Sequence, residues 1–324
     1  MSPILQVKNL VTEFGPPNGP RVRAVNDVSF SLERGRILGL VGESGSGKSV
    51  TGFSIIGLLD RPGRITSGQI LFDGDDLARL SGEEMRRLRG RRIAMVFQDP
   101  MMTLDPVLTI GTQMIEAVRA HDPVSKETAR QRSRDALALV GIPSADERLA
   151  AYPHQFSGGM RQRVAIAIAL LHQPDIIIAD EPTTALDVTI QSQIIAEFQR
   201  LVEMNNTAVI WITHDLAIVS RLADDIAVMY AGRLVETGAV GEVLSDPRHP
   251  YTKGLIASVP SENRRGTRLV QIPGMTPSLA RLPQGCSFRT RCPRATADCE
   301  AMPPLIEENG RAFRCIHPVL EGVS

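Results

Sequence analysis

This chain has little cysteine, and all of it lies at one end. Residues 1–285 contain none, and the four thiols, Cys286, Cys292, Cys299 and Cys315, all fall in the last 39 residues. The amino-terminal MSPILQVKNL lacks the charged-then-apolar pattern of a signal peptide. We therefore expect a cytoplasmic, reducing environment, in which clustered cysteines favour metal ligation or redox chemistry over a disulfide framework.

Long apolar runs and an excess of one charge are also missing. The longest apolar run, VAIAIALL at residues 164–171, falls well short of the roughly 18 residues that a membrane-spanning helix needs. Lys and Arg together number 36, as do Asp and Glu, so no broad basic surface is expected. These absences argue against a membrane-spanning protein and against a nucleic-acid partner.

The patterns that are present predict an α/β architecture. ILQVKNLV and AVNDVSFSL alternate apolar and polar residues and predict half-buried antiparallel strands. RILGLVG, DIIIAD and TAVIWITH are dense apolar runs, typical of buried parallel strands. The stretch from about residue 100 to 172 repeats its apolar residues at helical spacing. With 324 residues, the chain has room for one large domain and an appendage, or for two domains.

The composition changes near residue 258. Eight of the 22 prolines fall in residues 260–324, and apolar runs are few there. Such a segment buries little core of its own and needs a staple or a neighbour to be ordered. We therefore expect a domain over residues 1–258, with a helical subdomain at about 99–172, and a small cysteine-containing extension over residues 259–324.

A phosphate-binding loop is predicted at GESGSGKS, which fits G-x-x-x-x-G-K-[ST] between a buried strand and an apolar helix. Its backbone amides would cradle phosphate oxygens at the helix amino terminus. Lys48 would bridge the β- and γ-phosphates of a nucleotide, and the Ser49 hydroxyl would ligate Mg²⁺. The expected nucleotide-binding residues are Gly42, Ser44, Gly45, Ser46, Gly47, Lys48 and Ser49.

Two acidic residues follow a second buried run, in IIIADEP at residues 176–182. A carboxylate at the end of a buried strand suits the Mg²⁺ shell, and we assign this role to Asp180. Glu181 is placed to orient or deprotonate the attacking water. An acidic pair that caps the next helix is the alternative, and only the P-loop in the same chain favours the catalytic interpretation.

Four further motifs give a specific resemblance. FSGGMRQR at 156–163 is similar to the signature sequence of ATP-binding cassette (ABC) ATPases, TTALD at 183–187 to their D-loop, VFQD at 96–99 to their Q-loop and ITHD at 212–215 to their H-loop. Each motif occurs once, in the family's order, between residues 4 and about 245. The resemblance implies a RecA-like P-loop NTPase domain with an antiparallel β subdomain and a helical subdomain, binding ATP and Mg²⁺.

The resemblance also implies roles for residues outside the P-loop. Gln98 would sense the γ-phosphate and contribute to the Mg²⁺ site, and His214 would contact the γ-phosphate. Ser157, Gly158 and Gly159 precede a helix and would face a nucleotide held by a second ATP-binding subunit, identical or paralogous. Phe14 would stack on adenine, and Asp187 of the D-loop would complete the nucleotide site.

Three segments narrow the resemblance further. YPHQFSGGMRQR, DPMMTLDPVLTIG and HPYTKGL resemble the ATPase subunits of dipeptide and oligopeptide importers, which also carry a four-cysteine extension. This implies two transmembrane permease subunits, which residues 99–150 would contact. It also implies an extracytoplasmic peptide-binding protein and a place on the cytoplasmic face of the inner membrane. A nickel or glutathione importer of the same subfamily, or a soluble ABC ATPase, is the alternative function.

The four cysteines suit either of two metal sites. Structural zinc and a [4Fe–4S] cluster both take four thiolates, and the intervals of five, six and fifteen residues do not decide between them. The resemblance to peptide-importer ATPases implies the cluster, with a structural or sensing role. Nearby arginines would offset its negative charge, His317 is a possible substitute ligand, and loss of a cysteine is expected to spare MgATP binding. The arginines are Arg289, Arg291, Arg294 and Arg314.

Overall fold

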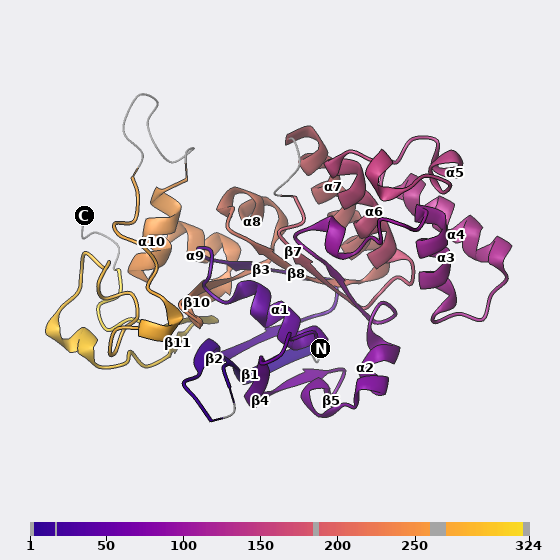
Figure 1. Cartoon of the computed structure of the whole chain (residues 1–324). Coiled ribbons are helices and arrows are strands. Elements are labelled where there is room, and N and C mark those ends of the chain that lie inside the picture. Colours follow the sequence, from indigo (N-terminus) through magenta and orange to yellow (C-terminus); the bar gives the residue numbers. More distant parts are fainter. Residues whose placement is uncertain (1–2, 17, 184–187, 260–269, 320–324) are drawn as a thin grey trace. The chain divides into compact units, whose positions relative to one another are not determined.

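The computed structural model describes residues 3–16, 18–183, 188–259 and 270–319. The chain divides into two compact units (Figure 1). The first unit takes residues 1–33, 37–78 and 211–324, and the second takes residues 34–36 and 79–210. Some of the predicted nucleotide motifs therefore lie in the first unit and others in the second.

An antiparallel sheet opens the first unit, as the alternating pattern predicts. Its strand order is β2-β1-β4-β5, with β1 paired antiparallel to both β2 and β4. Buried and exposed positions follow each other along β2 because side chains of a strand alternate between its faces. The bounds are β1 Leu5–Phe14, β2 Val22–Leu32, β4 Arg64–Phe72 and β5 Asp75–Asp76.

A second group of strands in this unit carries the P-loop. β3, Ile37–Val41, is buried at all five positions and pairs in parallel with β9, Asp225–Tyr230. β9 pairs antiparallel with β10, Arg233–Ala239. The P-loop leaves β3 and leads into α1, Lys48–Ile56. The other helices of the unit are α8 Leu216–Leu222, α9 Val240–Ser245 and α10 Pro250–Ala257.

The cysteine-bearing extension packs onto the same strands. β11, Ile306–Glu308, and β12, Arg311–Phe313, form an antiparallel pair, and β12 continues the ladder by pairing with β10. Two 3₁₀ turns, Leu279–Arg281 and Ala297–Glu300, supply the remaining regular structure of the described extension. The proline-rich segment, coloured yellow in Figure 1, is thus ordered by packing against the strands of the first unit, as expected for a segment with few apolar residues.

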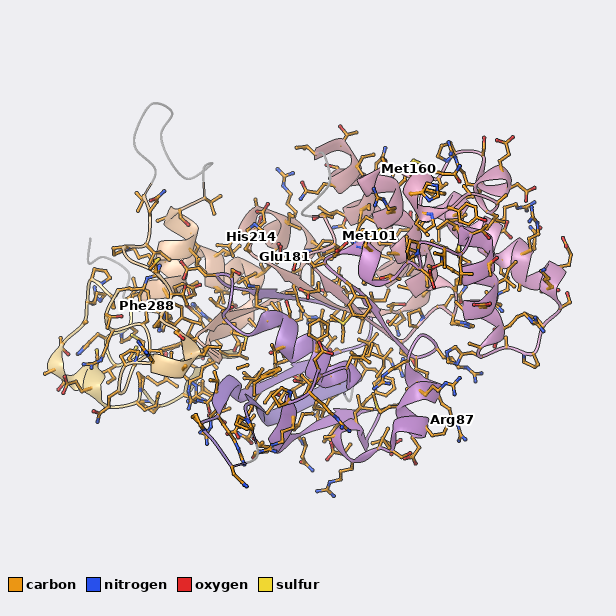
Figure 2. All side chains as sticks on the ribbon, viewed as in Figure 1. Arg87, Met101, Met160, Glu181, His214 and Phe288 are labelled. Carbon is orange, nitrogen blue, oxygen red and sulfur yellow. The ribbon has the colours of Figure 1, made fainter. Side chains whose placement is uncertain are left out.

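Phe288 provides the apolar anchor of the extension. Its side chain is 2% exposed, and its ring lies 5.2 Å from Tyr230, 5.4 Å from Tyr251 and 5.9 Å from His249, measured between centroids (labelled in Figure 2). Aromatic rings at these separations attract each other in addition to the area they bury. Two ion pairs, Arg311 with Glu236 and Arg314 with Asp27, add to this anchor.

The second unit contains the helix-rich stretch. Its strands β6, Ile93–Val96, and β7, Ile176–Asp180, are parallel and fully buried. Hydroxyl side chains cap four of these helices: Ser81 caps α2, Thr109 caps α3, Ser125 caps α4 and Ser157 caps α6. The helices are α2 Gly82–Leu88, α3 Ile110–Arg119, α4 Lys126–Leu139, α5 Ala145–Arg148, α6 Gly158–Leu170 and α7 Val188–Asn205.

The helical core of this unit confirms the periodicity seen in the sequence. Apolar side chains of α3, α4 and α6 bury one another, and most are less than 5% exposed. Gly111 allows a close approach, since a Cβ on it would lie 2.7 Å from the carbonyl oxygen of Leu149. β8, Ala208–Thr213, then carries the chain back to the first unit. Within the described residues, no helix has the length and apolar character to cross a membrane.

Candidate nucleotide site and cysteine cavity

The P-loop, residues 42–49, is packed tightly on one side and open on the other. Gly42 has a φ of 155°, and a Cβ on it would lie 2.2 Å from the carbonyl oxygen of Met229. Both the backbone angle and the close approach require glycine there. A Cβ on Gly45, in contrast, would meet no atom within 4 Å. An anion-binding loop at a helix amino terminus needs this open side.

Lys48 is folded back onto the start of the loop. Its side chain is buried, and Nζ donates to the carbonyl oxygens of Gly42 at 2.7 Å and Glu43 at 3.0 Å. Ser46 is fully buried, and its Oγ has no hydrogen-bond partner. Ser44 is exposed, Gly47 is the N-cap of α1, and Ser49 is half-buried in its first turn. The predicted P-loop residues therefore form one continuous loop that leads into the amino terminus of α1.

The acidic pair lies in the second unit, at the end of β7. Asp180 is the last residue of that strand and is 2% exposed. Glu181 follows in the left-handed region, with a φ of 45°. This conformation is strained for a residue with a side chain, at a cost of about 1–3 kcal/mol, and such strain is concentrated at functional sites. Glu181 is one of nine described non-glycine residues in this region, so its catalytic role stays a prediction.

The signature segment is also in the second unit. Ser157 caps α6, its Oγ accepting from the backbone N–H of Met160 at 3.2 Å. Gly158 and Ser157 are exposed, and a Cβ on Gly158 would meet no atom within 4 Å. Packing against the described residues therefore gives no reason for glycine at position 158. The open helix amino terminus has the geometry expected for a surface that receives an anion.

Four other predicted residues lie at the ends of elements or outside the description. Gln98 is exposed just after β6, and His214 is exposed just after β8. Phe14 ends β1, and its Cε1 would lie 2.5 Å from a Cβ on Gly63, so the ring packs on that turn. Asp187 lies outside the described residues. The adenine-stacking role of Phe14 stays a prediction.

The four cysteines line one small cavity in the first unit, with a volume of about 10 Å³. The backbone N–H of Cys286 donates to the carbonyl oxygen of Cys299 at 3.0 Å, which holds two of the four segments together. His317 also lines the cavity, and its Nε2 is 2.7 Å from Thr296 Oγ1. Cysteines separated by up to 29 positions in the chain (286 and 315) are thus brought to one place.

Burial sets the protonation of three of these thiols. It raises the pKa of Cys286 and of Cys292, and it raises the pKa of Cys315 to about 12. Backbone amides two residues further along oppose the rise, at Phe288, Arg294 and His317 respectively. The thiols are therefore protonated at neutral pH, and a metal that binds them as thiolates must displace protons.

The arginines near the cavity do not act as one group. Arg289 and Arg294 line it, and the Nε atom of each is buried without a hydrogen-bond partner. Arg291 pairs with Glu43 instead, and Arg314 pairs with Asp27. Arg289 also pairs with Glu300, at 3.0 Å. Three of the four arginines that the sequence places near the cysteines thus have carboxylate partners.

As placed, these side chains form no metal site. Among the described residues, no three His, Cys, Asp or Glu side chains come close enough together to hold a metal ion. This applies to the four cysteines, all of which are described. The orphaned Nε atoms and the amides beside the sulfurs nevertheless fit an anionic group bound by thiolates.

The sequence analysis missed Glu43, the second residue of the P-loop. Its carboxylate accepts hydrogen bonds from Arg291 and Thr276 of the extension, and Arg291 holds the pKa of this carboxyl below its usual value. A P-loop motif leaves this position open, so the sequence carries no signal of the pairing. The one available signal was that Glu43 is the only acidic residue in GESGSGKS.

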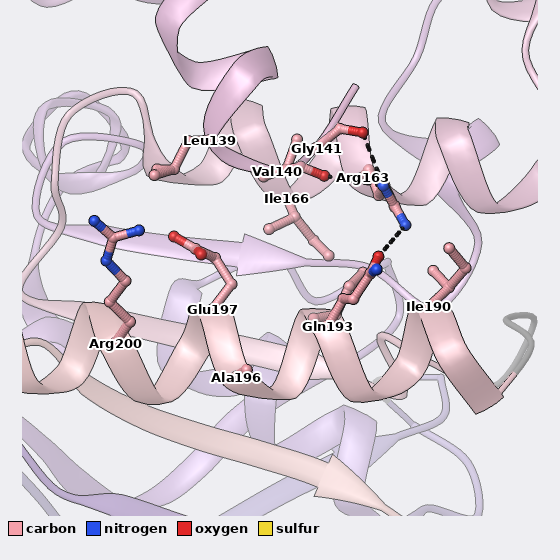
Figure 3. Close-up of a pocket in the computed structure, with 11 residues that line it drawn as sticks. Leu139, Val140, Gly141, Arg163, Ile166, Ile190, Gln193, Ala196, Glu197 and Arg200 are labelled. Atoms are coloured by element: carbon pink, nitrogen blue, oxygen red, sulfur yellow. Dashed lines mark hydrogen bonds between the residues drawn. The ribbon is translucent and has the colours of Figure 1, made fainter. Parts of the chain in front are cut away.

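A larger pocket, of about 670 Å³, opens in the second unit between the end of α4, α6 and α7 (Figure 3). Arg163 crosses one side of it, donating to the carbonyl oxygen of Gly141 at 2.9 Å and to Gln193 Oε1 at 2.8 Å. Apolar side chains such as Ile166 and Ile194 form much of its wall. None of the predicted nucleotide-binding residues that the structure describes lines this pocket.

Comparison with known proteins agrees with both parts of the chain. The family profile described as "ABC transporter" matches residues 25–184, and that described as "Oligopeptide/dipeptide transporter, C-terminal region" matches residues 235–299. The chain is 50% identical to the dipeptide transport ATP-binding protein DppD of Bacillus subtilis, over 97% of this chain and 95% of that protein. It is 48% identical to the oligopeptide transport ATP-binding protein OppD of Escherichia coli, over 98% and 94%.

The chain belongs to the dipeptide and oligopeptide transport ATP-binding proteins of the ABC family. A solved structure agrees: a dimeric ATP-binding cassette in a post-hydrolysis state, bound to ADP and Pi, matches with a TM-score of 0.66 and 27% identity. The match covers 73% of this chain and 98% of that cassette. The expected ABC cassette fold, a P-loop NTPase, is thereby confirmed.

Replacing Gly42 and replacing Gly158 should have very different effects on the free energy of unfolding. Gly42→Ala should lower the free energy of unfolding by about 1–3 kcal/mol, because its Cβ meets the Met229 carbonyl at an unfavourable φ. Gly158→Ala, the matched control, should leave stability unchanged or slightly raised, because its Cβ meets no atom within 4 Å. Urea unfolding of the full chain measures both. Equal losses in the two variants would contradict the packing described.

Proposed function

We propose that this chain is the ATP-hydrolysing subunit that powers import of dipeptides or oligopeptides through a membrane ABC transporter. The observation that carries the proposal is the 50% identity to a dipeptide transport ATP-binding protein along 97% of the chain. This similarity includes the carboxy-terminal region, whose profile bears the name of oligopeptide and dipeptide transporters. Peptide import is therefore favoured over the other substrates that the resemblance leaves open.

Each nucleotide motif has a role in this proposal. The amides of residues 42–49 and the α1 amino terminus bind the phosphates, and Lys48 neutralises the β- and γ-phosphate charge. Ser49, Gln98 and Asp180 would hold Mg²⁺, which polarises the γ-phosphate when bound. Glu181 accepts the proton of the attacking water, and His214 contacts the γ-phosphate. The strained backbone at Glu181 supports its role.

The signature implies a second ATP-binding subunit. One chain carries one P-loop and one signature, and Gly158 presents an open helix amino terminus that the chain itself leaves uncovered. We propose that this end, with Ser157 and Gly159, faces the γ-phosphate of a nucleotide held by a partner, with Asp187 nearby. The matching cassette is dimeric with ADP and Pi, which supports the arrangement. The partner is another copy or a paralogue.

The remaining partners follow from the proposed transport. Closure of the two ATP-binding subunits on ATP, and their opening after hydrolysis, would move two transmembrane permease subunits. A peptide-binding protein outside the membrane would deliver the substrate, so this chain acts on ATP and not on the peptide. Its place would be the cytoplasmic face of the inner membrane, as a peripheral subunit.

Replacing Glu181 tests the proposed chemistry. Glu181→Gln should slow ATP hydrolysis by about 10²–10⁴-fold, because the amide cannot accept the proton of water. It should still bind MgATP, whereas Lys48→Ala should weaken MgATP binding by removing a charge from the phosphates. Glu203→Gln, which changes an exposed carboxylate of α7, is the matched control and should behave as wild type. ATP hydrolysis and equilibrium MgATP binding are measured on the same preparations.

Peptide uptake by cells that carry each variant tests the coupling to transport. Glu181→Gln should abolish uptake, and Glu203→Gln should preserve it. If Glu181→Gln hydrolyses ATP within about tenfold of the wild-type rate, Glu181 is not the general base. If uptake continues without hydrolysis, the chain does not power the import.

We also propose that Cys286, Cys292, Cys299 and Cys315 hold a [4Fe–4S] cluster. Four convergent thiols, amides directed at three of them and two orphaned Nε atoms support a bound group that is anionic with its thiolates. The volume of about 10 Å³ is room for roughly one water, so the walls must move apart for a cluster. A single zinc ion is the alternative that the small volume favours.

Metal analysis of the anaerobically prepared chain distinguishes the two. The cluster predicts brown protein with about four irons per chain, bleached by Cys292→Ser because one thiolate is lost. Ser287→Ala, beside Cys286 but without a thiol, is the matched control and should stay brown. Colourless protein that holds one zinc per chain would overturn the cluster and leave a four-cysteine zinc site.

A further inference from the structure

The backbone of Glu43 shapes the phosphate-binding loop. Its carbonyl oxygen accepts from Lys48 Nζ at 3.0 Å and from the backbone N–H of Ser46 at 3.2 Å. Its own N–H donates to the hydroxyl of Tyr251 at 2.9 Å. The position of Glu43 therefore decides where the lysine is held and how the loop turns after Gly42.

The side chain of Glu43 is held by the carboxy-terminal extension. Arg291 Nη1 lies 2.6 Å from Glu43 Oε2 and Nη2 lies 2.9 Å from Oε1, so the guanidinium grips both oxygens. Thr276 Oγ1 donates to Oε2 at 2.6 Å. Two-point contacts of this kind fix orientation as well as distance, and they are stronger than bonds between neutral groups. The extension thus fixes a P-loop residue.

Arg291 is itself locked in place. Its side chain is 4% exposed, and Nε donates to the carbonyl oxygen of Pro273 at 2.8 Å. Nη2 also approaches the carbonyl oxygen of Gly274, and Nη1 approaches the hydroxyl of Tyr230, each at 3.4 Å. A guanidinium held on several sides acts as a rigid support for its carboxylate partner.

Docking of the extension does not depend on this contact. β12 pairs with β10, Phe288 fills an aromatic cluster, and Arg314 pairs with Asp27 at 2.7 Å. The extension therefore stays attached when Arg291 is replaced. Arg314 is the comparison for a residue that only attaches the extension to the rest of the chain, because its ion-pair partner, Asp27, lies outside the P-loop.

We propose that Arg291 is a positioning residue of the nucleotide site: it holds Glu43 and so sets the shape of the P-loop for the phosphates. The inference rests on the proposed ATP-binding function and adds residues of the extension to that site. Because Arg291 precedes Cys292, the rigid support is built directly beside the cysteine cavity.

Equilibrium binding of MgATP to the full chain, together with ATP hydrolysis, tests the proposal. Arg291→Ala should weaken MgATP binding about tenfold or more, the scale of a lost hydrogen bond to a charged group. KM should rise with kcat little changed, because the P-loop holds phosphates in the ground state and the transition state alike. Arg291→Lys, which keeps the charge without the two-point grip, should recover part of the affinity.

Two controls separate positioning from attachment. Arg314→Ala removes an ion pair of the same kind from the extension and should leave MgATP affinity unchanged. Glu43→Gln should weaken binding as Arg291→Ala does, and the double variant should be no worse than either, because both act through one contact. Circular dichroism and iron content should stay at wild-type values in all of these variants.

The outcomes are distinct. Unchanged affinity in Arg291→Ala, equal loss in Arg314→Ala, or additive losses in the double variant would each overturn the proposal while ATP binding by the wild-type chain stands. Should Arg291→Ala fail to fold, Glu43→Gln decides by the same affinity criterion. If the wild-type chain does not bind MgATP, the proposed function fails and this inference fails with it.

Discussion

The ion pair between Glu43 and Arg291 joins two parts of the chain that the sequence presents as separate. One partner is the second residue of the P-loop, and the other lies in a proline-rich extension more than 200 residues later. Because Lys48 is bonded to the carbonyl oxygen of Glu43, the geometry of the phosphate-binding lysine is linked to the extension. The nucleotide-binding loop therefore depends on contacts that a minimal cassette of strands and helices would not supply.

The composition of the extension explains why it attaches as it does. A segment with few apolar residues cannot form a core of its own, so it adds β12 to an existing ladder and inserts Phe288 among aromatic rings. Its arginines pair with carboxylates outside the extension, at Asp27, Glu43 and Glu236. The cysteine cavity forms inside this docked segment, which keeps four thiols of distant sequence position together.

Much of the fold followed from pattern. Alternation predicted the antiparallel sheet around β1, dense apolar runs predicted β3, β7 and β8, and helical spacing predicted α3 and α4. The P-loop and Asp180 were found because their chemistry needs particular residues in a fixed local order. The sequence placed Ser157, Gly158 and Gly159 before a helix, and in the structure that helix, α6, begins at Gly158 with Ser157 as its cap.

What the sequence did not predict depends on long-range contact or on backbone conformation. The left-handed turn at Glu181 has no glycine or asparagine to signal it. The partner of Glu43 could not be read from spacing, because any of the four arginines near the cysteines was an equal candidate. Two of those arginines, Arg289 and Arg294, line the cavity, and three of the four, Arg289, Arg291 and Arg314, pair with carboxylates.

The central claim is that the extension holds the P-loop in shape before nucleotide arrives. Amide hydrogen exchange of residues 42–49, measured without nucleotide in the wild type, Arg291→Ala and Arg314→Ala, tests it most directly. We expect faster exchange of this loop in Arg291→Ala alone, because the Glu43 N–H to Tyr251 bond and the Ser46 N–H to Glu43 bond would open more often. Wild-type exchange rates in Arg291→Ala, or equal acceleration in Arg314→Ala, would contradict it.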